Sequence, residues 1–194
     1  MSNRKQEIVQ RILLAAVKVF DKYGLQKTTM RDIAESAGMS KSSLYYYFKS
    51  KKDILASVVK RESAMMIQKL SEVVQRETSP QKKLYAYVTT RIHLLYKLTV
   101  YYSSLSNAYI DHYDFIEEER EAFTNFEIDS VSEILKGGIS SGIFQKQNVK
   151  ATAKAIIIII KALELRLFLS KSKDELESTI ETMLGILFQG LEKR

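Results

Sequence analysis

The sequence has few residues that break or cross-link a chain: its 194 residues include one proline, seven glycines and no cysteine. Without cysteine the chain can form neither disulfides nor thiolate metal sites, which fits the reducing environment of the cytoplasm. The scarcity of helix breakers, together with 45 % hydrophobic residues, favours a nearly all-helical protein. We therefore expect an all-α fold of about nine helices and a cytoplasmic location.

The sequence also lacks the residue groups on which enzymes depend. It has two histidines, and it has no nucleophile–base–acid set, glycine-rich phosphate loop or metal-ligand spacing. We expect no catalytic residue, no metal site and no cofactor. The most apolar segment, residues 155–162, contains five consecutive isoleucines, but Lys154, Lys161 and Glu164 make it too short and too charged to span a bilayer. The charged N-terminal residues do not form a signal peptide.

Residues 29–48 have the pattern of two short helices joined by a tight turn. Thr29 can cap the first helix, and Asp32, three residues later, can complete a capping box. Gly38 ends this helix, because glycine enters the left-handed backbone conformation at little cost. Ser40 can cap the second helix. This order of signals predicts a helix-turn-helix.

The second helix of this motif has an inner and an outer side. Leu44 and Phe48 lie four residues apart and face inward, whereas hydrogen-bonding side chains suited to a major groove occupy the outer side. Charge gives independent support, because residues 1–60 contain 12 Lys and Arg against 5 Asp and Glu, while residues 61–194 contain 18 of each kind. DNA affinity depends largely on neutralised phosphates, so the positive charge lies where a DNA-binding segment needs it.

Residues 8–55 resemble the N-terminal domain of the tetracycline-repressor (TetR) family of bacterial transcription regulators. The order and the spacing of the matching residues agree over some four dozen positions, whereas the rest of the chain fits the family in length and helical texture. The matching residues are Ile12, Ala15, Ala16, Phe20, Tyr23, Gly24, Thr28, Thr29, Ile33, Ala34, Ala37, Gly38, Met39, Ser40, Leu44, Tyr45, Tyr47, Phe48, Lys51 and Leu55.

The motif and the resemblance together assign the expected DNA contacts. Thr29 would hold a phosphate at a helix N-terminus, Lys41 would reach guanine acceptors, and Tyr45 would either pack or reach a phosphate. The helix carries no Arg, Asn or Gln, so DNA shape is expected to contribute heavily to specificity. Expected DNA-binding residues are Thr28, Thr29, Ser40, Lys41, Ser42, Ser43, Tyr45, Tyr46, Tyr47 and Lys51, with Lys41, Ser42 and Ser43 at base edges and Tyr46, Tyr47 and Lys51 on the backbone.

Helix signals organise the rest of the chain. We expect a DNA-binding domain over residues 1–50 and an effector-binding and dimerisation domain over residues 51–194. Nine acidic residues at 111–133 would form a solvated face that keeps DNA away. A helix capped by Ser50 has no glycine or proline hinge and would act as a rigid lever. Helices are expected at residues 5–23, 50–77, 80–105, 117–141, 149–170 and 172–191, with caps at Ser79, Asn148 and Ser172.

The isoleucine run has no amphipathic period, so its helix should be buried on more than one side. A symmetric partner that contributes an equivalent pair of helices would bury it in a four-helix interface, and the TetR resemblance also implies a homodimer on a palindromic operator. An intramolecular core is the alternative. The expected interface residues are Ile156, Ile160, Leu163, Ile180, Leu184, Leu187 and Phe188.

The resemblance further implies a small-molecule pocket among the central helices, whose occupation releases DNA. The aromatic residues of this region favour an apolar or aromatic effector, and a drug-like molecule, a fatty acyl compound and a metabolite all fit. The expected ligand-binding residues are Tyr85, His93, Tyr96, Tyr102, Tyr109, Phe123, Phe126 and Glu164, with Arg91, Arg120 and Arg166 as further polar candidates.

These expectations describe a ligand-responsive DNA-binding regulator of transcription, with repression as the favoured mode. The main alternative is a nucleoid or division-associated DNA-binding protein on the same scaffold, which would bind many sites and ignore small molecules. A membrane-associated helical protein is disfavoured, because the chain has no span and no basic amphipathic anchor outside the motif.

Overall fold

The structure, a computed structural model, describes residues 3–101, 113–170 and 173–193. Over these ranges the fold is all-α, as predicted, with nine helices and a single isolated bridge between Phe144 and Glu192. No helix in the described ranges is long and apolar enough to cross a membrane.

The chain forms two compact units. Unit 1 consists of Met1–Ser63 and Tyr101–Arg120, and unit 2 of Ala64–Val100 and Glu121–Arg194. The boundary expected after residue 50 thus differs from the observed one, because the first turns of the next helix bury side chains in the core of unit 1. A segment distant in sequence also joins unit 1.

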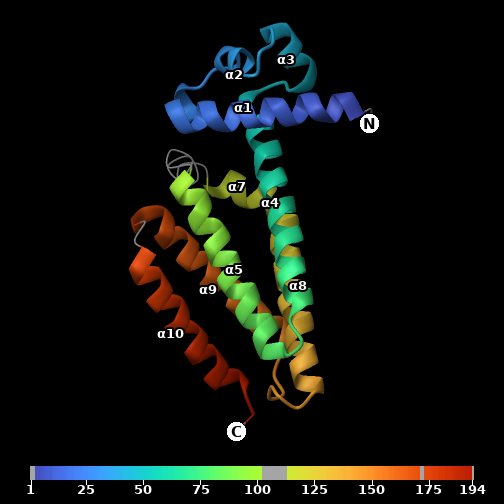
Figure 1. Cartoon of the computed structure of the whole chain (residues 1–194), viewed down its shortest axis with the longest axis vertical. Coiled ribbons are helices and arrows are strands. Elements are labelled where there is room, and N and C mark those ends of the chain that lie inside the picture. The colour runs from blue at the N-terminus through green and yellow to red at the C-terminus, as the bar shows by residue number, and fades with distance from the viewer. Residues whose placement is uncertain (1–2, 102–112, 171–172, 194) are drawn as a thin grey trace. The chain divides into compact units, whose positions relative to one another are not determined.

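Unit 1 is built around α1 (Asn3–Lys27), with α2 (Met30–Ser36) and α3 (Lys41–Tyr47) lying together on one side of it (Figure 1). The beginning of α4 (Lys51–Arg76) and the short α7 (Tyr113–Glu119) complete the unit. The backbone of α1 leaves helical geometry at Gly24, in agreement with the expected helix end at residue 23. Side chains from the first four helices form the core, among them Ile12, Phe20, Ile33, Leu44 and Ile54.

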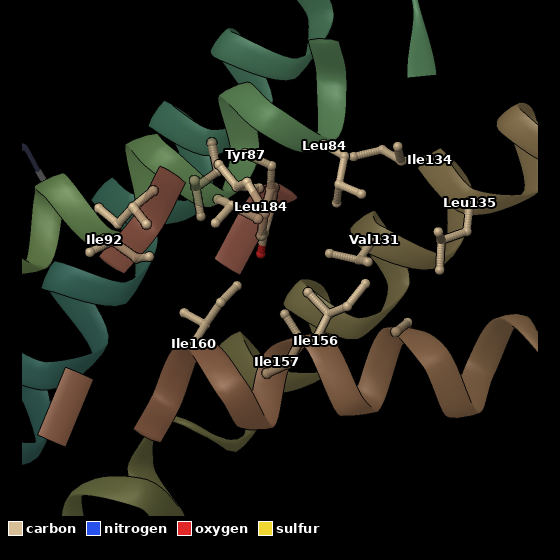
Figure 2. Close-up of a cluster of buried hydrophobic side chains, with 14 of the residues drawn as sticks. Leu84, Tyr87, Ile92, Val131, Ile134, Leu135, Ile156, Ile157, Ile160 and Leu184 are labelled. Carbon is tan, nitrogen blue, oxygen red and sulfur yellow. The ribbon is translucent and has the colours of Figure 1, made fainter. Parts of the chain in front are cut away.

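Unit 2 contains the rest of α4 together with α5 (Pro80–Tyr101), α8 (Glu121–Ser140), α9 (Val149–Ser170) and α10 (Lys173–Leu191). Figure 2 shows side chains from α5, α8, α9 and α10 meeting in one hydrophobic cluster. Each helix contributes aliphatic side chains at helical spacing, which is why the four pack together. The labelled members are Leu84, Tyr87, Ile92, Val131, Ile134, Leu135, Ile156, Ile157, Ile160 and Leu184.

Most of the expected helix starts are confirmed by side-chain caps. The backbone N–H of Asp53 donates to the Ser50 hydroxyl at 3.1 Å, and the N–H of Lys82 donates to the Ser79 hydroxyl at 3.2 Å. The amide oxygen of Asn148 accepts from the N–H of Ala151 at 3.1 Å. These bonds satisfy N–H groups that a helix leaves without partners, so the cap residues define where each helix begins. Ser172 lies outside the described residues.

The single acidic helix expected over residues 117–141 is wrong, because the structure has two helices there. The break falls at Arg120, whose backbone N–H donates to the carbonyls of Ile116 and Glu117 at 3.0 and 3.2 Å. The Arg120 side chain is buried, so the chain turns to bring a charged residue inward where the sequence pattern indicated a solvated face.

The ends of α8 and α10 are joined at one corner of unit 2. The N–H of Gln145 donates to the Leu191 carbonyl at 2.8 Å, and the N–H of Lys193 donates to the Ile143 carbonyl at 3.0 Å. The buried Phe144 ring lies against Gly138, where any side chain would overlap it. Gly138 therefore permits this close approach of the turn to α8.

Candidate nucleic-acid interface

The capping box expected at the start of α2 is present. The Thr29 hydroxyl accepts from the N–H of Asp32 at 3.2 Å, and the Asp32 carboxylate accepts from the Thr29 N–H at 2.8 Å and from its hydroxyl at 2.7 Å. The bond from the Thr29 hydroxyl, followed by that from its N–H, lowers the pKa of Asp32 below its ordinary value. The box fixes the start of α2 through bonds that span three residues.

The turn between α2 and α3 has the expected form. Gly38 has a φ of 65°, in the left-handed region, and its N–H donates to the Glu35 carbonyl at 3.1 Å. The N–H of Met39 donates to the Ala34 carbonyl at 3.0 Å. Because a residue with a side chain is disfavoured at this φ, glycine suits the position that aims α3 away from α2.

Three serines gather at the start of α3. The Ser40 hydroxyl accepts from the N–H of Ser43 at 3.1 Å and lies 2.9 and 2.8 Å from the hydroxyls of Ser42 and Ser43. All three side chains are exposed. They therefore present a compact group of hydroxyls that can donate to and accept from base edges or phosphates.

The outer side of α3 carries the expected exposed side chains. Lys41 is exposed and its ammonium lies 5.8 Å from the centre of the Tyr45 ring. Tyr46 is 77 % exposed and meets the half-buried Tyr47 edge to face, with ring centres 5.1 Å apart. This side thus combines one cation, hydroxyls and aromatic rings, which together suit contacts with a nucleic-acid groove and its backbone.

Two of the expected DNA-binding residues lie elsewhere. Thr28 is buried, and its hydroxyl donates to the Gly24 carbonyl at 2.7 Å. The Lys51 ammonium donates to the carbonyls of Leu25 and Gln26 at 2.8 Å and of Thr28 at 3.0 Å. Both side chains are committed to the chain itself, so neither belongs to the exposed face of the motif.

Sequence reasoning omitted Arg31, which is exposed on α2 and pairs with Glu35 at 2.8 Å. The signal was available, because Arg31 lies two residues before the buried Ile33 and therefore on the opposite side of the helix from it. It also omitted α7, where the Phe115 ring packs against the core of unit 1 and lies 4.3 Å from the Lys52 ammonium. No local sequence pattern predicts the contact between Phe115 and Lys52, because more than 60 residues separate them.

Comparison with known proteins identifies the motif. The family model described as bacterial regulatory proteins, tetR family, matches residues 12–58, which span α2, α3 and the start of α4. The HTH-type transcriptional regulator QacR of Staphylococcus aureus is 30 % identical over 151 residues, which cover 74 % of this chain and 77 % of that protein. The chain belongs to the TetR family.

Two further comparisons support this assignment. The HTH-type transcriptional repressor KstR2 of Mycolicibacterium smegmatis is 29 % identical over 149 residues, covering 74 % of this chain and 69 % of the relative. The crystal structure of the regulator FadR from Bacillus subtilis, in complex with stearoyl-CoA, has the same fold, with a TM-score of 0.73, 22 % identity, and coverage of 93 % of this chain and 98 % of that one. This TetR-family chain is a DNA-binding regulator of transcription.

The residues expected to bind a ligand in this TetR-family chain are scattered. Tyr85 is exposed and His93 half-buried on α5, where the Tyr85 hydroxyl donates to Glu181 at 2.7 Å and His93 Nε2 lies 2.9 Å from Glu177. Tyr96 packs at the edge of the core, and the buried Phe123 stacks on Phe126 with ring centres 6.4 Å apart. Phe126 lines a groove together with residues of α4 and α5. Tyr102, Tyr109 and the Glu164 side chain lie outside the described residues.

A buried polar group that the sequence pattern did not reveal occupies the interior of unit 2. Arg91 and Glu127 are both 0 % exposed, and Arg91 Nε donates to Glu127 Oε1 at 2.7 Å. The hydroxyl of the buried Tyr87 donates to the same oxygen at 3.4 Å, and burial raises the Tyr87 pKa, which keeps this hydroxyl protonated. Glu127 is one of the nine acidic residues expected on a solvated face, so that expectation is wrong at this position.

The residues expected at a dimer interface lie mainly in the core of unit 2. Ile156, Ile160, Ile180 and Leu184 are buried there, and Leu163, Leu187 and Phe188 pack against them. Five consecutive isoleucines cover every side of a helix, and three of them face the unit itself. The exposed members are Ile158 and Ile159 on α9, with Ile186 exposed on α10.

Proposed function

We propose that this TetR-family regulator represses transcription as a homodimer on a palindromic operator and that an acyl compound releases it from DNA. The exposed outer side of α3 is the observation that carries the proposal. It lies in a segment, residues 1–60, with a net charge of +7. A helix of this kind reads a major groove, and two copies related by a two-fold axis would read half-sites roughly 34 Å or a multiple of it apart.

Two uncharged stripes on α9 and α10 support the homodimer. Ile158 is 66 % exposed and Ile186 is 68 % exposed, which is unusual for large aliphatic side chains that have no partner. A Cβ at Gly185 would meet no atom of the chain, so this glycine serves no packing need within the unit and leaves room for a second copy. The exposed stripes contain Ala151, Ala155, Ile158, Ile159 and Ala162 on α9, and Ser178, Thr182, Gly185, Ile186 and Gln189 on α10.

A groove between α4, α5 and α8 is the favoured effector site. Its volume is about 310 Å³, at the lower end of the range of small-molecule pockets, roughly 300–1,000 Å³. Tyr87 lines the groove and links it to the buried Arg91–Glu127 pair. Its apolar lining, called the floor below, consists of Leu70, Val74, Tyr87, Phe126 and Ile134, and its polar lining, called the rim, of Ser71, Gln75, Lys83, Ser130 and Glu133.

The chemistry of this groove favours a fatty acyl compound among the three effector classes that the sequence left open. An alkyl chain would cover the apolar floor, and the Lys83 ammonium at the rim would attract an anionic head group. The Bacillus subtilis FadR structure, which has the same fold, was solved with stearoyl-CoA. Release requires that the effector bind the DNA-free form more tightly than the DNA-bound form.

Selection of genomic DNA tests the first half of the proposal. Fragments retained by the purified chain at near-physiological salt would be sequenced, and one palindrome should dominate. Ile158→Glu combined with Ile186→Glu should give a monomer in sedimentation and abolish that enrichment, whereas Lys150→Glu, also exposed on α9, should do neither. Retention of all fragments alike would favour the nucleoid or division-associated role.

Release of the selected operator tests the second half. Stearoyl-CoA should dissociate the complex, and coenzyme A alone should not. Ser130→Trp places a ring in the groove and should abolish the response, while Asn125→Trp, exposed on the same helix and outside the groove, should preserve it. An equal response from both variants would remove the groove from the proposal.

A further inference from the structure

Lys51 differs from every other basic residue near the helix-turn-helix. Residues 1–60 contain 12 Lys and Arg, and 11 of them have exposed side chains. The side chain of Lys51 is half-buried. A lysine that binds phosphate needs a free ammonium at the surface, so the burial of Lys51 indicates a different role.

The ammonium of Lys51 has three N–H groups, and the structure gives each of them an acceptor. The carbonyl oxygens of Leu25 and Gln26 lie at 2.8 Å and that of Thr28 at 3.0 Å. These carbonyls follow the point at which α1 leaves helical geometry, so no helical N–H is available to them. A cation at such a position completes their hydrogen bonding and is favoured by the helix dipole.

The hydrogen bonds of Lys51 join the two ends of the helix-turn-helix segment. Thr28 immediately precedes the N-cap of α2, and Lys51 is the first residue of α4, so both α2 and α3 lie in the chain between them. Thr28 is itself held to α1, because its hydroxyl donates to the Gly24 carbonyl at 2.7 Å. The helix-turn-helix is thus a loop whose ends are clasped by one side chain.

We propose that Lys51 is a positioning residue for operator recognition: its ammonium clasps the segment before α2 to the first turn of α4 and so sets the position of α3. It acts through α3 and does not contact DNA. The inference rests on the proposed operator binding. It also makes a distinct prediction for DNA of random sequence, where charge dominates and the position of α3 matters little.

Lys51→Met removes the clasp and keeps the aliphatic stem. Binding to the selected operator should weaken about tenfold. The slope of log affinity against log salt should be unchanged, because loss of one phosphate contact would reduce it by about 0.9. Binding to random-sequence DNA should also be unchanged. Lys49→Met, which replaces an exposed side chain two residues away, is the control: any loss of affinity that it causes should come with a lower salt slope.

Two results would overturn the inference. A salt slope reduced by about 0.9 in Lys51→Met would make Lys51 a phosphate contact. An unchanged operator affinity, with or without a lower melting temperature, would leave Lys51 a purely stabilising role. Lys51→Gln retains two N–H donors and should lose less operator affinity than Lys51→Met. If Lys51→Met does not fold, the same binding measurements are made on Lys51→Gln. Because binding to random-sequence DNA is measured in parallel, absence of any operator would be recognised as failure of the proposed function itself.

Discussion

The two units of this protein place their charged side chains in opposite ways. In residues 1–60, which belong to unit 1, 11 of 12 basic side chains are exposed, whereas unit 2 holds Arg91 and Glu127 at 0 % exposure. Exposed cations stay hydrated and can neutralise the phosphates of an external partner. A buried pair is committed to the interior and must offset the cost of its own desolvation. The location of charge therefore separates the surface that we propose to contact DNA from the interior of unit 2.

The units also differ in the range of their hydrogen bonds. The caps that organise α2 and α3 join residues three positions apart, such as Thr29 with Asp32. Unit 2 has local caps of the same kind, but its buried and interhelical polar contacts join distant segments, with 36 positions separating Arg91 from Glu127 and 96 separating Tyr85 from Glu181. Local bonds can form as a helix forms, whereas distant ones require the packed unit.

The buried pair should give the largest effect on stability. Glu127→Gln removes the charge that balances Arg91 and should lower the free energy of unfolding by about 3–5 kcal/mol. Glu133→Gln removes a surface partner of Lys136 and should cost less than about 1 kcal/mol. Urea denaturation of both variants measures the difference. The double variant Arg91→Met/Glu127→Leu should recover most of the loss, and equal losses in the double and single variants would contradict this account.

The turn after α8 should give the next largest effect. Gly138→Ala would place a Cβ 2.0 Å from the Phe144 ring, and the overlap should cost about 1–3 kcal/mol. Gly137→Ala, one residue earlier, meets no atom within 4 Å and should stabilise its helix by about 0.5–1 kcal/mol. Thermal unfolding should therefore move in opposite directions for two neighbouring substitutions. A common direction would show that the contact with Phe144 is not what fixes this turn.

An exposed cation in unit 1 should affect binding without affecting stability. Lys41→Ala should weaken operator binding by about 1–3 kcal/mol, the range for a lost base contact, and leave the melting temperature unchanged. Lys146→Ala, which removes an exposed lysine of unit 2, should change neither. Fluorescence anisotropy with the selected operator and a thermal melt measure both quantities. Equal losses of operator affinity in Lys41→Ala and Lys146→Ala would contradict the assignment of DNA binding to unit 1.

The capping box should give the smallest effect and one that depends on pH. Thr29 holds the pKa of Asp32 below its ordinary value, so the ionised carboxylate stabilises the fold above that ordinary value, and this contribution is lost as the pH falls through the lowered one. Asp32→Asn should therefore destabilise unit 1 near neutral pH, and the difference from the parent chain should shrink in acid. Melting temperatures from pH 7 to pH 3 test this. Thr29→Val loses the hydroxyl but keeps the backbone N–H, so it should reduce the same pH dependence. A difference between Asp32→Asn and the parent chain that grew in acid would contradict this sign.

Much of the motif could be predicted because its signals are local. Gly38 stops α2 through its own backbone freedom, and Ser40, Ser50, Ser79 and Asn148 cap helices through bonds three residues long. The exposed side of α3 lies opposite Leu44 and Phe48, which are buried one helical turn apart on the inner side. The burial of Thr28 and the hydrogen bonds of Lys51 could not be predicted, because both depend on where the end of α1 meets α4.

Residue types at short spacing are enough to predict most of the helices, the motif and the charge of the first 60 residues. Long-range packing sets which side of the isoleucine run faces the core, buries Glu127 beside Arg91 and joins α7 to the unit of the helix-turn-helix. A uniformly apolar run has no preferred face, and a charged residue looks the same in sequence whether it meets water or a distant partner. Packing resolves both, because a buried charge is stable only where the fold brings its counterpart within hydrogen-bond distance.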